Sequence, residues 1–309
     1  MTAPPGVIKA FEPRGPLQQF RLAENTAFIC FRCRDRKIAK LQAVYSGDWT
    51  KRLCNGCYGY LLSLYEIKAG TASDDEKAEA LSRALLLAVK PEERRKAEQL
   101  FRTSTKRAEY LSPEALLFIA TAEHVARSIE TTSFEWSPAV VVLCKALETE
   151  LVTRIMRPLR ACVSSENLAP DCSDNDIGRV AKFCSDPNRS PPELGTFAHF
   201  LRTVIHSKDR RQTSLLIRAF VRLMADWPGS QWLLDPQGLC HDLAALSEIR
   251  NRATHTGVIG REDYKTCREH VIGASGMIWK LVNSTDGTSR DRSAGNRISP
   301  AAPVAHKCR

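Results

Sequence analysis

The sequence lacks the features that define several common classes of protein. No uninterrupted apolar run approaches the roughly 20 residues that a membrane-spanning helix needs, so we expect no membrane association. The N-terminal residues lack the apolar core of a secretory signal, which predicts a reducing, cytoplasmic setting. No G-x-x-x-x-G-K-[ST], G-x-S-x-G or H-E-x-x-H motif occurs, which argues against the common NTPase, hydrolase and metalloprotease designs.

Charge and cysteine content narrow the remaining classes. The 309 residues include 11 cysteines, too few for a disulfide scaffold, so we interpret them as metal ligands or core residues. The net charge of +10 is uneven: residues 1–69 hold 11 basic and 5 acidic residues, whereas residues 112–281 are neutral. A basic end of this kind can concentrate a polyanion by releasing its counterions, although the charges could equally be a solvated surface.

Composition and periodicity divide the chain into segments, and most of it reads as helix. From residue 112 onward, apolar residues recur at helical spacing, which predicts an all-α bundle with a small N-terminal metal module. The expected segments are a flexible leader (1–26), a four-cysteine zinc module (27–69), a helical connector (70–111), a helical domain (112–284) and a disordered basic tail (285–309).

Prolines mark the expected helix boundaries. Pro91 opens the second connector helix, and the Ser-Pro pairs at Ser112 and Ser137 each place an N-cap before proline at the first helical position. We expect Pro158 to end the helix that starts near Ser137. Further helical patterns cover roughly 194–206, 211–226, 239–255 and 261–283.

Two C-x-x-C pairs predict a structural zinc site. Cys30 and Cys33 form the first pair, and Cys54 and Cys57 form the second, with 20 residues between the pairs. Four thiolates fill a tetrahedral zinc ion and leave no position for water, so such an ion holds structure and does not catalyse. A segment this short has little core, and metal binding would supply its folding free energy. Free core cysteines and a redox C-x-x-C pair are the alternatives.

The second pair runs into an apolar helical stretch, YLLSLYEI, with Trp49 just upstream. This arrangement resembles the second knuckle of GATA-type treble-clef fingers, in which the pair opens a helix. The resemblance covers about 30 residues and implies architecture more than function. Basic residues outnumber acidic ones in and between the pairs, where only Asp35 and Asp48 are acidic, so both nucleic-acid contact and protein contact stay open. The basic residues are Arg32, Arg34, Arg36, Lys37, Lys40, Lys51 and Arg52.

The most informative segment of the helical domain is CHDLAALSEIRNRATHTGVIG. Arg250, Asn251 and His255 lie just off the apolar stripe of this predicted helix. Asn251 and His255, four residues apart, share a face, whereas Arg250 and His255 are roughly 140° apart around the helix. A long arginine side chain or a second subunit would be needed to unite that pair.

The segment from Arg250 to His255 resembles the R-N-x-x-x-H motif of HEPN-domain proteins, and the helical setting over 112–284 is similar to that family. The resemblance implies a homodimeric, metal-independent endoribonuclease with Arg250, Asn251 and His255 as catalytic residues. An imidazole can move the proton of a 2′-hydroxyl, and a guanidinium can hold the scissile phosphate. The implied products are a 2′,3′-cyclic phosphate and a 5′-hydroxyl, in a toxin, stress or antiviral defence setting that could include a cognate antitoxin.

Two other functions remain open at this stage. The chain could be a non-catalytic adaptor whose zinc module binds nucleic acid or protein, since Arg, Asn and His near a helix end also serve as caps and ion-pair partners. A GATA-like DNA-binding regulator is the third hypothesis, and it leaves the larger helical domain unexplained.

Overall fold

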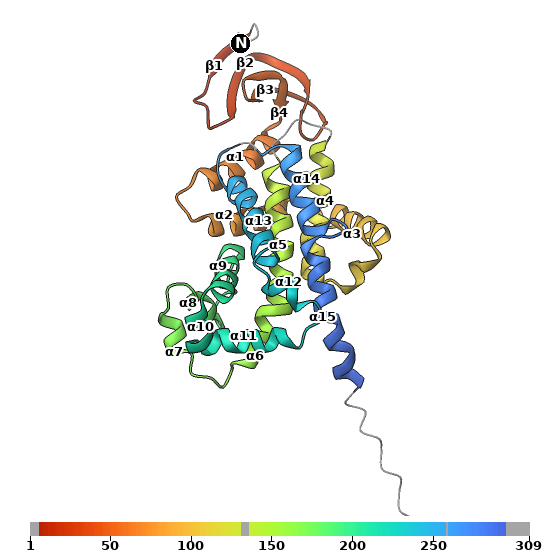
Figure 1. The fold of residues 1–309 in the computed structure, drawn as a ribbon. Coiled ribbons are helices and arrows are strands. Elements are labelled where there is room, and N and C mark those ends of the chain that lie inside the picture. Colours follow the sequence, from red (N-terminus) through yellow and green to blue (C-terminus); the bar gives the residue numbers. More distant parts are fainter. Residues whose placement is uncertain (1–5, 131–135, 258, 295–309) are drawn as a thin grey trace, which may run out of the picture. The chain divides into compact units, whose positions relative to one another are not determined.

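The computed structural model describes residues 6–130, 136–257 and 259–294, and it is mostly helical with one small sheet (Figure 1). Contacts divide the chain into two compact units, Met1–Thr149 with Ala244–Gly273 and Glu150–Leu243 with Ala274–Arg309. The first unit thus includes residues from the expected zinc module, connector and helical domain. None of the described helices combines the length and hydropathy that a membrane crossing requires.

The first unit begins with a four-stranded antiparallel sheet in the order β1-β2-β3-β4. Its strands are β1 (Val7–Ala10), β2 (Leu17–Ile29), β3 (Arg36–Tyr45) and β4 (Asp48–Leu53). Ser46 and Gly47 both have positive φ, at 52° and 71°, as the tight hairpin between β3 and β4 requires. The sheet differs from the expected flexible leader over 1–26, since β1 and most of β2 lie within that segment.

Helices make up the rest of the first unit. They are α1 (Asn55–Ala69), α2 (Asp74–Ala88), α3 (Pro91–Ser104), the 3₁₀ turn η1 (Lys106–Tyr110), α4 (Pro113–Glu130), α5 (Ser137–Leu151), the end of α13 (Leu239–Thr254) and α14 (Arg261–Ile272). The expected starts are confirmed at Pro91, which opens α3, and at Ser112, whose hydroxyl accepts a hydrogen bond from the Ala115 N–H at 3.2 Å.

Apolar side chains from three helices form the centre of the first unit. Leu81 and Leu85 on α2, Ile119 on α4, and Leu143 and Leu147 on α5 are each less than 2% exposed. Burying one such side chain contributes about 1.5–3 kcal/mol. Helices α2, α4 and α5 therefore each contribute fully buried apolar side chains to this unit.

The second unit is also helical. Its elements are the π-helical turn η2 (Val152–Met156), α6 (Arg157–Cys162), α7 (Ala169–Ser173), α8 (Gly178–Ser185), α9 (Leu194–His206), α10 (Lys208–Thr213), α11 (Leu215–Ala225), α12 (Ser230–Leu234) and α15 (Met277–Ala294). Phe200 and Phe220 meet edge to face in its core, with ring centroids 5.1 Å apart. Trp279 is 2% exposed.

Two expected helix boundaries are wrong, and each has a physical reason. Pro158 does not end the helical chain: η2 precedes it, and Pro158 falls in the first turn of α6, where its missing N–H is not needed. The helix expected over 261–283 is broken at Gly273, where a Cβ would lie 2.5 Å from the Glu269 carbonyl oxygen.

The segment predicted to be a disordered tail is helical at its start. Helix α15 continues to Ala294, beyond the expected start of the disordered tail at residue 285. The remainder of that tail, residues 295–309, lies outside the described residues.

The N-terminus of α2 offers a test of local stability. Ser73 and Glu76 form a reciprocal capping box, in which the Ser73 hydroxyl accepts from the Glu76 N–H and Glu76 accepts from the Ser73 N–H. We expect Ser73→Ala to lower the free energy of unfolding by about 1 kcal/mol in urea titrations. Ser63→Ala, which removes an exposed mid-helix hydroxyl, is the matched control and should change it by less. Equal effects of the two substitutions would contradict a special role for the cap.

Candidate functional site

The two C-x-x-C pairs converge on one point. Cys30 directly follows β2, Cys33 lies in the loop before β3, Cys54 follows β4, and Cys57 is in the first turn of α1. Their four sulfur atoms all lie within 4.8 Å of one another. This is the one group of three or more potential metal ligands found among the described residues. The helix expected after the second pair is present as α1.

The donor set fits a four-coordinate metal ion that prefers sulfur. The Cys33 and Cys54 sulfurs are 3.9 Å apart, close to the separation of about 3.8 Å that a tetrahedron with 2.3 Å metal–sulfur bonds requires. The Cys54 N–H donates to the Cys30 sulfur at 3.4 Å, which stabilises a thiolate there. Arg34 has a φ of 63°, and its N–H closes the first turn on the Cys30 carbonyl at 2.9 Å. When bound, the ion would hold the ends of three strands to α1.

The thiols differ in how readily they lose protons. A hydrogen bond from Cys57, helped by backbone N–H groups and opposed by burial, lowers the pKa of Cys30 to about 4. Burial raises the pKa of Cys33 to about 11, and the bond to Cys30 raises the pKa of Cys57. A cation that binds all four sulfurs must displace the remaining protons, so acid favours its release.

We expect purified protein to contain about one equivalent of metal per chain, measured by inductively coupled plasma mass spectrometry. Cys33→Ser should reduce the metal content and expose the module to proteolysis, because a hydroxyl is a poor substitute for a thiolate. The matched control is Cys162→Ser, which alters an exposed cysteine outside the cluster. A metal content that Cys33→Ser leaves unchanged would contradict the four-cysteine site.

Three arginines of the module lie over aromatic rings. The guanidinium of Arg32 is 4.0 Å from the ring centre of Tyr60, and those of Arg34 and Arg52 are 5.3 Å from Phe31 and 5.6 Å from Phe28. Such pairs hold cations in place without neutralising them. The module therefore keeps a basic character in the folded state.

Arg250 lies in the last two turns of α13 and is buried. Its side chain is only 5% exposed, and its guanidinium forms an ion pair with Asp75 in the first turn of α2. Its Nη1 donates a second hydrogen bond to the Asn251 side-chain oxygen at 3.1 Å. The sequence separation between Arg250 and Asp75 is 175 residues.

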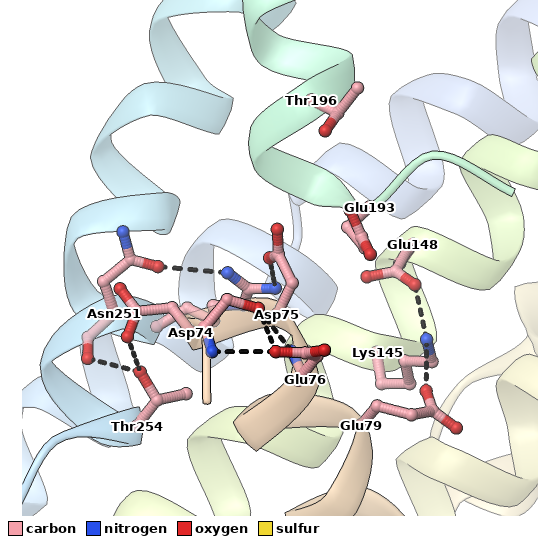
Figure 2. Close-up of polar contacts among 12 residues, drawn as sticks. Asp74, Asp75, Glu76, Glu79, Lys145, Glu148, Glu193, Thr196, Asn251 and Thr254 are labelled. Atoms are coloured by element: carbon pink, nitrogen blue, oxygen red, sulfur yellow. Dashed lines mark hydrogen bonds and ion pairs between the residues drawn. The ribbon is translucent and has the colours of Figure 1, made fainter. Parts of the chain in front are cut away.

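His255 follows the end of α13 and is exposed. Its Nε2 lies 3.2 Å from Oδ1 of Asp74, and the two side chains are 59% and 30% exposed. The Thr254 hydroxyl lies 3.0 Å from the same Asp74 oxygen and 2.8 Å from the Asn251 carbonyl. Figure 2 shows Asn251 and Thr254 beside the acidic first turn of α2.

The structure places Arg250 in a buried ion pair and His255 at the surface, and it gives each an acidic partner that sequence reasoning missed. Asn251 contacts Arg250, and in the described part of the chain no direct hydrogen bond joins Arg250 to His255. Both ends of the motif instead meet neighbouring carboxylates, Asp74 and Asp75. The available signal was the run Ser73-Asp74-Asp75-Glu76, which reads as a helix start with acidic residues in its first turn.

The histidine and the arginine of the motif have different surroundings. The carboxylate of Asp74 lies beside the exposed imidazole of His255, as in pairs in which a carboxylate orients a histidine. The guanidinium of Arg250 is neutralised by Asp75 and withdrawn from solvent. Both carboxylates lie in the first turn of α2, where the helix dipole favours negative charge.

The Asp75–Arg250 pair should contribute strongly to stability. Asp75→Asn leaves a buried guanidinium without its charge partner, and we expect a loss of about 3 kcal/mol in the free energy of unfolding. Glu92→Gln is the matched control, because Glu92 is an exposed acid in the first turn of α3 and contributes only through the helix dipole. If Asp75→Asn lowers the free energy of unfolding no more than Glu92→Gln does, the Asp75–Arg250 pair contributes no more to stability than an exposed acid.

No protein-family model matches the chain, and neither a curated protein nor a solved structure gives a significant match. The function must therefore be argued from the site itself.

Proposed function

We propose that this chain is an endoribonuclease that cleaves RNA by attack of the 2′-hydroxyl on the adjacent phosphate, with His255 as the proton-transfer residue. The observation that carries the proposal is the contact between Asp74 and the exposed imidazole of His255 at 3.2 Å. The sequence resemblance of the motif to HEPN-domain ribonucleases gives the same assignment independently of the geometry.

The reaction needs only a few groups. RNA supplies its own nucleophile, so the protein has to remove one proton from the 2′-hydroxyl and return one to the departing 5′-oxygen. His255 lies at the surface, where a polymer can reach it, and the neighbouring carboxylate of Asp74 fixes the orientation of its imidazole. The products are then a 2′,3′-cyclic phosphate and a 5′-hydroxyl. DNA, which lacks the nucleophile, stays intact.

Arg250 enters this mechanism by exchange of partners. Carboxylate and phosphate oxygens bind the same N–H donors of a guanidinium, so a phosphate placed at the end of α13 competes with Asp75. Asn251, hydrogen-bonded to Arg250, holds the guanidinium in position during that exchange. In the homodimer that the resemblance implies, a second copy of the chain would bring its own Arg250 and His255 to the same phosphodiester.

The four-cysteine module would bind zinc and serve RNA capture. Four sulfur donors at tetrahedral spacing are the usual ligands of structural zinc. The arginines that lie over aromatic rings in this module would attract the RNA backbone whatever its sequence. Added salt should weaken this attraction. In this proposal the ion takes no part in the reaction.

We expect purified protein to cleave a single-stranded RNA, with 2′,3′-cyclic phosphate ends detected by mass spectrometry of the fragments. His255→Gln should lower the cleavage rate at least about 100-fold, because removing a general acid–base residue commonly costs 10²–10⁴. His241→Gln is the matched control: His241 is also exposed and lies 3.8 Å from an aspartate, Asp242, away from the motif. A chelator is added together with the substrate and not beforehand, so that the protein keeps the metal in its four-cysteine site.

Equal cleavage by the two variants would remove His255 from the mechanism. Cleavage of the 2′-deoxy version of the substrate would rule out 2′-hydroxyl attack.

A non-catalytic adaptor is the second candidate, and one observation favours it. The buried position of Arg250 beneath Asp75 is also the arrangement expected of a purely structural ion pair. An adaptor predicts that wild-type protein binds RNA or a protein partner and leaves every RNA in a total cellular pool uncut. The cleavage assay therefore separates the two functions.

A further inference from the structure

The second unit contains a basic segment that the ribonuclease proposal does not use. Residues 112–281 are neutral as a whole, yet residues 202–211 (RTVIHSKDRR) include four Lys and Arg residues and one acid, Asp209. The segment covers the end of α9, the cap residue Ser207 and the start of α10. Positive charge is therefore concentrated where these two helices meet.

Two arginines of this segment have structural partners. The guanidinium of Arg211 donates to two main-chain carbonyls at the end of α9. The guanidinium of Arg210 forms ion pairs with Asp174, at 3.2 Å, and with Asp176. These contacts fix the corner between the two helices and hold its charged groups in place.

Arg202 and His206 differ from these arginines in having no such partner. They lie one turn apart on the same face of α9, and both are exposed. Neither forms an ion pair or a hydrogen bond in the part of the chain that the structure describes. The guanidinium presents its N–H groups as a planar fork, and the imidazole adds at least one more donor. These donors are available to a ligand.

Both side chains line an open cavity in the second unit. Its volume is about 450 Å³, within the range of about 300–1,000 Å³ typical of small-molecule sites. Every described lining residue is polar or charged, so the cavity suits a charged ligand and not an apolar one. The lining residues, all within the second unit, are Asp176, Arg202, Thr203, His206, Ser207 and Arg210.

The lining favours an anion. It holds two arginines and one histidine against one described acid, Asp176. The Asp176 carboxylate pairs with Arg210 and lies 3.4 Å from Nε2 of His199, and Asp174, the other partner of Arg210, does not line the cavity. The Ser207 hydroxyl accepts a hydrogen bond from the Arg210 N–H at 3.4 Å, so its own proton can be donated to a ligand oxygen.

We propose that this cavity binds the terminal phosphate of a small phosphomonoester, with its oxygens held by Arg202, His206 and Ser207. The guanidinium, the imidazole and the hydroxyl together offer about four donors. A terminal phosphate presents about three free acceptor oxygens, more than a carboxylate or a phosphodiester, and its bonds to arginine are strengthened by charge. The inference rests on the second unit alone and holds whether or not the chain cuts RNA.

Matched ligands without a 2′-hydroxyl test the chemistry on the isotope-labelled full chain. We expect inorganic phosphate and thymidine 5′-monophosphate to shift the NMR signals of the Arg202 Nε–H and the His206 imidazole in a saturable way. Thymidine, which lacks the phosphate, should shift neither signal. The phosphodiester thymidylyl-thymidine should bind about tenfold more weakly than the monoester, because it offers fewer charged acceptors. Equal affinity for the two esters would overturn the monoester assignment, and unchanged Arg202 and His206 signals would overturn the site.

One substitution and its control locate the site. Arg202→Gln should weaken the binding of thymidine 5′-monophosphate about tenfold or more, because it removes charge-assisted hydrogen bonds. Arg218→Gln is the matched control and should change the affinity much less, because Arg218 is also an exposed arginine, on α11, and does not line the cavity. Wild-type affinity of Arg202→Gln, or equal weakening by both variants, would overturn the assignment. The ligand comparison decides the case by itself if the circular dichroism spectrum shows that Arg202→Gln does not fold.

Discussion

The candidate site depends on the acidic first turn of α2. Asp74 and Asp75 are adjacent in sequence, and each holds a different part of the segment that ends α13: Asp75 binds Arg250, and Asp74 binds Thr254 and His255. The Ser73 cap fixes the start of this helix, and the helix dipole favours negative charge there. Because Arg250 is buried, its ion pair is only weakly screened by water. The position of the exposed histidine therefore follows from a helix start that lies far away in sequence.

A second set of contacts joins the cysteine cluster to the same segment. Cys57 lies in the first turn of α1, and Lys68 lies in its last turn. The ammonium of Lys68 donates to the carbonyl of Gly257, two residues beyond His255. One rigid helix thus connects a metal-binding end with the loop that follows the motif.

Much of the local structure could be predicted from the sequence, because it depends on neighbouring residues. The C-x-x-C spacing located the cluster, and serine and proline located the starts of α3 and α4. The same local patterns could not predict which residues far apart in sequence would form ion pairs. Sequence proximity favours acidic partners close to the motif, yet the acids that bind it are Asp74 and Asp75. Nothing in the sequence near residue 250 specifies which distant helix start will pack against it.

The errors have a common cause. The expected leader over 1–26 contains β1 and β2, since long strands with mixed polarity on an exposed sheet lack a clear alternating pattern. Pro158 does not end the helical segment, because the π-helical turn η2 before it changes the pattern of backbone hydrogen bonds. Both features depend on packing and hydrogen bonds that residue types alone do not determine.

The account is tested most directly by where RNA binds. We expect a non-cleavable 2′-O-methyl RNA, added to isotope-labelled protein, to shift the NMR signals of the His255 imidazole and the Arg250 side-chain N–H groups. The Arg250 signals should change as phosphate replaces Asp75. If the RNA shifts only signals of the four-cysteine module and leaves both motif residues unaffected, the arginine and histidine form a structural clasp and the ribonuclease account is wrong.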